Sequence, residues 1–141
     1  MKMKFVMGPA ALLAMVLTAC SSGGEASEPL ELSAGSGGAM ASCLALDPAI
    51  LGEMPVAFEG TATAVDGERV TLEVTHWFTG GDADEVVVSA PMGLEALIGG
   101  ISFEVGEKYL ISATNGTVNY CGFSGPATEE LRAAFDEAFG A

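Results

Sequence analysis

Apolar and polar residues alternate along several short segments in the middle of this chain. The clearest alternation covers residues 69–78, and a period of two predicts a half-buried β-strand. One face of this strand would carry Val70, Leu72, Val74, His76 and Phe78, and the other would carry Thr71, Glu73, Thr75 and Trp77. The composition of residues 56–65, 85–90, 108–113 and 117–121 also predicts strands, with Gly60 marking a bulge or bend in the first of them.

Turn and helix signals complete the predicted fold. Asp66-Gly67 and Asn115-Gly116 are typical of tight hairpin turns. Thr128 is a good helix N-cap, and apolar residues recur after it in one stripe that would dock on the sheet: Leu131, Ala134, Phe135, Ala138 and Phe139. Five short strands and a C-terminal α-helix predict a mainly β fold, a small five-stranded closed or half-closed barrel. A small β-sandwich is the alternative.

The first twenty residues have the pattern of an export signal. Lys2 and Lys4 precede an apolar run at 5–16, which is shorter than the about 20 residues that span a bilayer. Residues 17–20, Leu-Thr-Ala-Cys, resemble the lipobox of bacterial lipoproteins, in which the cysteine is lipidated and becomes the first mature residue. We therefore expect residues 1–19 to be a signal peptide and Cys20 to anchor the protein to the cell membrane, facing the extracytoplasmic side. The alternative is an ordinary secreted protein.

Composition separates a tether from a folded domain and gives the chain a strong negative charge. Residues 20–41 are rich in Gly, Ser and Glu and predict a flexible linker, so the folded domain would span residues 42–141. The chain has 5 Lys and Arg against 19 Asp and Glu, a net charge of −14. Removal of residues 1–19 takes away two lysines and no acid, which brings the charge to −16. Such a surface repels nucleic acid and anionic lipid head groups, which argues against a nucleic-acid partner.

Two cysteines are left once Cys20 is assigned to lipidation. Cys43 and Cys121 would pair in an oxidising, exported compartment, closing a loop of about 79 residues. The alternative is a metal or redox pair. The chain has no Cys-x-x-Cys spacing and only one histidine, so a structural disulfide is the favoured prediction.

Candidate catalytic and metal-binding residues are few. His76 is the only imidazole, and its place among the apolar residues of its strand favours a packed or half-exposed structural histidine. Asp82, Asp84 and Glu85 predict a solvated acidic loop, with oxygen ligation of Ca²⁺ as the alternative. The sequence shows neither a nucleophile–base pair nor a zinc site, so we expect no enzyme activity, no metal and no cofactor.

Three further motifs lie at residues 76–80 (His-Trp-Phe-Thr-Gly), 105–111 (Val-Gly-Glu-Lys-Tyr-Leu-Ile) and 121–125 (Cys-Gly-Phe-Ser-Gly). Together with Cys43 and the strand at 58–62, which come in matching order, they resemble netrin-like modules, a family that includes the inhibitory domain of tissue inhibitors of metalloproteinases. The similarity covers about residues 43–125. It implies an OB-like β-barrel that binds proteins. The zinc chelation of those inhibitors depends on a free N-terminal cysteine, which the internal Cys43 does not provide.

These observations predict a non-enzymatic, lipid-anchored module that binds a protein or another component of the cell envelope. Trp77, Asp82 and Asp84 are the candidate partner contacts, because an exposed tryptophan is favoured at interface hot spots. The alternative for Trp77 is packing against the C-terminal helix or a loop. A small envelope hydrolase using paired carboxylates and a spacer without a specific ligand are the alternative functions.

Overall fold

A computed structural model describes residues 27–34, 44–89 and 101–140 of this chain. Its strands are β1 (Leu30–Ser33), β2 (Val56–Asp66), β3 (Arg69–Thr79), β4 (Glu85–Ser89), β5 (Lys108–Thr114), β6 (Thr117–Val118) and β7 (Gly125–Pro126). Its helices are α1 (Pro48–Leu51) and α2 (Glu129–Phe139). The predicted mainly β fold with a C-terminal helix is therefore confirmed.

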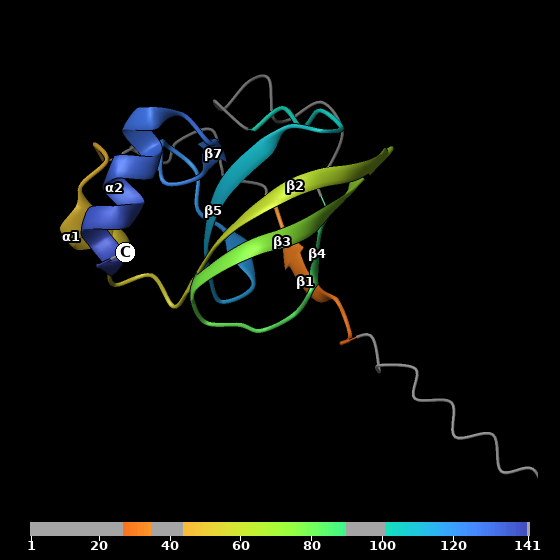
Figure 1. Cartoon of the computed structure of the whole chain (residues 1–141), viewed down its shortest axis with the longest axis horizontal. Coiled ribbons are helices and arrows are strands. Elements are labelled where there is room, and N and C mark those ends of the chain that lie inside the picture. The colour runs from red at the N-terminus through yellow and green to blue at the C-terminus, as the bar shows by residue number, and fades with distance from the viewer. Residues whose placement is uncertain (1–26, 35–43, 90–100, 141) are drawn as a thin grey trace, which may run out of the picture.

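The strands form a closed barrel. Their order is β2-β3-β4-β1-β6-β5-β7, and an additional antiparallel pairing of β2 with β5 closes a ring of six strands. The seventh strand, β7, pairs with β5 outside this ring. The fold is a small OB-like barrel with α2 beside it, as Figure 1 shows. The sequence correctly predicted a barrel but gave it five strands. The structure has six strands in the ring and a seventh, β7, paired outside it.

The additional ring strand is β1, which lies inside the segment predicted to be a flexible tether. Residues 30–33 pair in parallel with β4 along their whole length, and Ser33 also pairs with Thr117 of β6. Leu32 is only 4% exposed and belongs to the core. The prediction of a flexible linker over residues 20–41 is wrong here, because four alternating residues among Gly and Ser carry too little signal to identify a strand.

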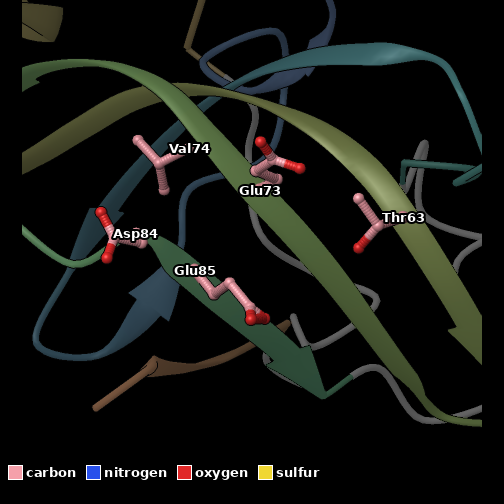
Figure 2. A pocket seen from close by; sticks show the side chains of 5 residues that line it. All are labelled: Thr63, Glu73, Val74, Asp84 and Glu85. Atoms are coloured by element: carbon pink, nitrogen blue, oxygen red, sulfur yellow. The ribbon is translucent and has the colours of Figure 1, made fainter. Parts of the chain in front are cut away.

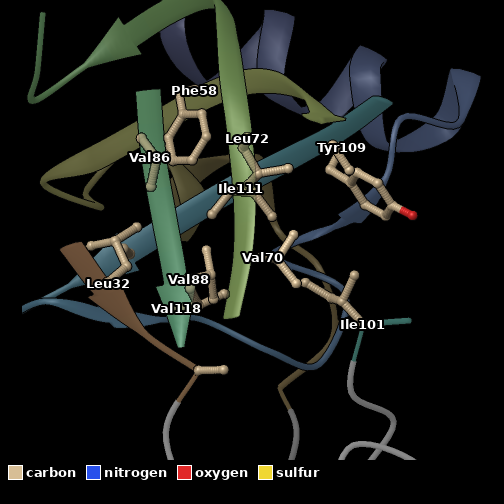
Figure 3. Packing of buried hydrophobic residues seen from close by; sticks show 13 residues of the cluster. Leu32, Phe58, Val70, Leu72, Val86, Val88, Ile101, Tyr109, Ile111 and Val118 are labelled. Atoms are coloured by element: carbon tan, nitrogen blue, oxygen red, sulfur yellow. The ribbon is translucent and has the colours of Figure 1, made fainter. Parts of the chain in front are cut away.

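Two hydrophobic clusters lie on opposite sides of the sheet. The first fills the barrel, where Phe58 of β2, Leu72 of β3 and Ile111 of β5 are fully buried (Figure 3). The second lies between the barrel and the helices and includes Leu110 and Phe135. Because neighbouring residues of a strand point to opposite faces, Leu110 and Ile111 serve different clusters. The predicted docking of the α2 stripe on the sheet is thus confirmed.

The end of β3 departs from the predicted alternation because the strand contains a bulge. His76 pairs with Glu59 and Val74 pairs with Gly60, so Thr75 is an extra residue opposite the bend predicted at Gly60. The bulge switches the two faces of the strand. Val70 and Leu72 are buried in the barrel core and the half-buried Val74 packs against it, as expected, but the next side chain packed against this core is that of Trp77 rather than His76.

Candidate functional site

An open groove of about 490 Å³ lies on the outer surface of the barrel where β3 meets the start of β4. Thr63 of β2, Glu73 and Val74 of β3, and Asp84 and Glu85 at the start of β4 line it (Figure 2). Three of these five residues carry carboxylates. The groove is therefore an acidic surface carried on three adjacent strands of a rigid barrel.

The strand register places two of these acidic residues directly opposite each other on neighbouring strands. Glu73 is the direct cross-strand partner of Glu85, and both residues are exposed. Like charges directly opposite each other on neighbouring strands are destabilising. Hydrogen bonding of the Val74 amide to the Asp84 carbonyl, at 2.8 Å, continues the β3–β4 ladder into this acidic end.

The described basic residues are engaged elsewhere. Arg69 pairs with Glu31 at 3.2 Å, with both side chains 59% exposed. Lys108 and Arg132 both pair with Glu59. Each of the three Lys and Arg residues in the described ranges thus pairs with a carboxylate outside the groove, so the groove has no cationic partner among them.

Trp77 fixes the loop that leads into the groove. Its indole Nε1 donates a hydrogen bond to the Ala83 carbonyl at 2.9 Å, and the centroid of its ring lies 5.0 Å from the ring centroid of Phe58. A Cβ atom at Gly81 would come within 2.5 Å of the indole, so this position accepts only glycine without movement. Trp77 is half-buried and packs against this loop, in agreement with the alternative prediction. The prediction that it lies exposed on the polar face of its strand is wrong.

The structure separates the predicted contact residues Asp82 and Asp84. Both are exposed, but only Asp84 lines the groove, together with Glu73 and Glu85. Asp84 also exchanges two hydrogen bonds with Ser27: the Ser27 hydroxyl donates to Oδ2 at 3.3 Å, and the Asp84 amide donates to Ser27 Oγ at 3.1 Å. The segment before β1 therefore meets the border of the groove.

Sequence reasoning missed Glu73 as a groove residue. Its position on the polar face of its strand is visible in the alternation, but its pairing with Glu85 depends on the register of two strands. Two signals were available, the acidic start of β4 and the acidic residue in the middle of β3. If β3 and β4 are paired as an antiparallel hairpin around the loop of residues 80–84, these two acidic positions fall opposite each other.

The only histidine lies outside the groove. His76 is exposed and makes an edge-to-face contact with Phe78, the two ring centroids being 4.6 Å apart. Phe78 in turn contacts Phe135 of α2 at 5.3 Å. Within residues 27–34, 44–89 and 101–140, no group of three His, Cys, Asp or Glu side chains is arranged to hold a metal ion.

A second cluster of charges, centred on Glu59, ties the barrel to α2. Glu59 is only 7% exposed, and its Oε1 accepts a hydrogen bond from the Thr75 hydroxyl at 2.8 Å. Lys108 Nζ lies 3.8 Å from the same oxygen, and Arg132 of α2 pairs with Oε2. Burial raises the pKa of Glu59, but Thr75 and the two cations outweigh it and hold the pKa below its ordinary value.

The predicted lipidation and disulfide sites lie mostly outside the described residues. This applies to Cys20 and to Cys43. Cys121 lies in the described part of the chain and adopts a left-handed backbone conformation with φ of 62°. Its pairing with Cys43 stays a prediction.

Comparisons with protein-family models and with curated protein sequences give no relative from which a function could be transferred. The chain matches no protein-family model and no curated protein sequence. In the described ranges, no helix has both the length and the apolar character needed to cross a membrane. The case for a function therefore depends on the groove and on the N-terminal sequence.

Proposed function

We propose that this protein is a lipid-anchored, non-enzymatic binding module of the bacterial cell envelope, whose acidic groove binds a cationic segment of a partner protein. The observation that carries the proposal is the cross-strand pair of Glu73 and Glu85, with Asp84 beside them in the same groove. The Lys and Arg side chains in the described ranges pair with other carboxylates and do not neutralise this charge. Lysine or arginine side chains entering the groove would relieve this repulsion.

The location of the groove supports binding. OB-fold barrels that bind oligonucleotides or oligosaccharides do so on the face formed by the second and third strands, with adjoining loops. Among the five strands β2 to β6, the second and third are β3 and β4, and these strands carry Glu73 and Glu85. The net charge of −14 would also attract a cationic partner from a distance and raise its association rate.

The exposure of the carboxylates favours binding over hydrolysis. A glycosidase needs one carboxyl group that stays protonated, and in lysozyme an apolar pocket achieves this. Glu73, Asp84 and Glu85 are all exposed in the groove. Their surroundings therefore suit an ionic contact and offer no apolar pocket for a general acid.

The anchor is inferred from residues 17–20 and can be tested separately. Lipidation at Cys20 would hold the protein in membranes until detergent is added, and the mature protein would carry the mass of its acyl chains. Detergent partitioning and intact-mass measurement of the same sample check both points. Release by a salt wash, with an unmodified Cys20, would overturn the anchor but not the groove.

The double variant Glu73→Gln/Glu85→Gln tests the groove. The probe is a short oligo-arginine peptide, measured by calorimetry at low and at physiological salt. Each exposed ion pair contributes about 0.2–1 kcal/mol, so loss of two should weaken binding by about 2- to 30-fold. Binding should also weaken as salt rises, because exposed charges are screened.

The matched control removes the same charge from another groove. Glu53→Gln/Glu137→Gln changes two acids that line a groove of about 400 Å³ beside α1 and α2. This control should bind the peptide nearly as well as the natural protein. Equal weakening by both pairs of substitutions would mean that overall charge attracts the peptide, and the acidic groove would lose its role.

A further inference from the structure

The barrel depends on β1 for its closure. Strands β2 to β6 alone form an open sheet in the order β4-β3-β2-β5-β6, whose free edges are β4 and β6. Strand β1 pairs in parallel with both of these edges. In Figure 1 it is the short orange arrow beside β4. Without β1, a slot for one extended segment would separate the two edges.

The slot between β4 and β6 fits one short sequence pattern. The Ser33 amide donates a hydrogen bond to the Gly116 carbonyl, and the Ala34 amide donates one to the Ser89 carbonyl, both at 2.8 Å. Leu32 and Ala34 are each 4% exposed and point into the core of the barrel. The slot therefore accepts an extended segment with apolar residues at alternate positions.

The connection to β1 is long enough to reach a second molecule. Residues 34–47 separate β1 from α1, and fourteen residues extend to about 45–50 Å. A domain of this size is roughly 35 Å across. Even if Cys43 is held by Cys121, the nine residues from 34 to 42 would extend to about 30 Å. Strand β1 differs in this respect from β2 and β3, which a tight turn joins.

We propose that two copies of this chain exchange β1, so that residues 30–33 of each copy fill the slot between β4 and β6 of the other. Exchange of an identical element is a low-cost route to a dimer, because every contact of the closed monomer is formed again in the pair. A second copy is the proposed occupant because it carries the same Leu32 and Ala34 that fill the slot, on a connection of fourteen residues that can reach a neighbouring barrel.

The exchange would also connect the acidic groove to the partner copy. Ser27 precedes β1 and is hydrogen-bonded to Asp84, so an exchanged β1 would bring the Ser27 of one copy to the Asp84 of the other. Each groove border would then contain a residue of both copies. This proposal does not depend on what the groove binds.

The test uses the register pair Ser33 and Ser89, which are Cα partners in β1 and β4. Two complete chains are prepared with different tags, one carrying Ser33→Cys and the other Ser89→Cys. They are mixed, partly unfolded in urea, refolded together and oxidised. Exchange predicts a covalent dimer carrying both tags, in which mass spectrometry finds a disulfide between positions 33 and 89.

Two controls make the result decisive. Ser33→Cys mixed with Glu137→Cys, an exposed position on α2, measures random cross-linking. The double variant Ser33→Cys/Ser89→Cys closes the disulfide within one chain, and oxidising it before mixing should suppress dimer formation. The proposal is overturned if the 33–89 pair gives no more mixed dimer than the 33–137 pair, or if the oxidised double variant still forms the dimer.

Discussion

Arg132→Met tests how far the Glu59 cluster stabilises the fold. The substitution keeps an unbranched side chain on α2 but removes the guanidinium group that pairs with Glu59 Oε2. The carboxylate then keeps only the Thr75 hydroxyl at 2.8 Å and the Lys108 ammonium at 3.8 Å. A charge that is nearly buried thereby loses its main partner.

The magnitude follows from the exposure of the two side chains. The side chain of Glu59 is 9% exposed and the side chain of Arg132 is 42% exposed. Removing one partner of a fully buried ion pair costs about 3–5 kcal/mol. A hydrogen bond to a charged group contributes about 1.5–3 kcal/mol, which suits a pair whose cation is half in water. We expect a loss of about 1.5–3 kcal/mol, or about 8–15 °C in the melting temperature.

The loss should depend on pH in a defined direction. The pKa of Glu59 is below 4.5 in the folded protein despite its burial. A carboxyl group with a lowered pKa adds stability above its unfolded pKa, and this contribution disappears as pH falls through the folded pKa. Loss of Arg132 raises the pKa of Glu59, so the stability difference between the two proteins should be full at pH 7 and shrink below about pH 4.5.

The assay is urea unfolding at pH 7 and at pH 3, followed by the fluorescence of Trp77, the single tryptophan. Lys108→Met is the control, because its ammonium lies 3.8 Å from Glu59 and its side chain is 57% exposed, so it should cost at most about 1 kcal/mol. The reasoning is refuted if Arg132→Met costs less than about 0.5 kcal/mol at pH 7. It is equally refuted if the difference from the natural protein is the same at both pH values.

Three further substitutions and one control variant probe the loop and the closing strand, each measured by the midpoint of urea unfolding. Gly80→Ala should lower the free energy of unfolding by at least about 2 kcal/mol, because φ is +84° and the new Cβ would lie 2.0 Å from the Pro55 carbonyl oxygen. The control Gly106→Ala has a similar φ of +92° but open space around the new Cβ, so it should lower it by about 1 kcal/mol. Equal costs would contradict the steric argument. Trp77→Phe, followed by circular dichroism, should cost about 0.5–1.5 kcal/mol through loss of the indole hydrogen bond, and no change would show that the bond does not hold the loop. Leu32→Ala should cost about 2–5 kcal/mol if β1 is part of the core, while a neutral effect would restore the tether interpretation.

Local patterns in the sequence determined much of the fold. The alternation at residues 69–74, the Asp66-Gly67 turn and the Thr128 cap all predicted the elements that are observed. Each of these signals involves neighbours within a few residues, where side-chain direction and backbone preference act directly. The mainly β barrel with a helix docked on one side followed from adding them together.

Features that depend on distant segments were decided only by the tertiary structure. The bulge at Thr75 moved Trp77 into the interior, because register is set between strands and not along one strand. Strand β1 is too short to be recognised alone, and it exists because β4 and β6 offer it hydrogen bonds and a place for Leu32.

The candidate site has the same origin. The sequence alone marked its acidic residues and the strongly negative charge of the chain. It could not show that Glu73 lies opposite Glu85, or that Arg132 and Lys108 form ion pairs with Glu59 and not with the acids of the groove. A charge is a property of one residue, whereas its neutralisation depends on which segments the folded chain brings within a few ångströms of it.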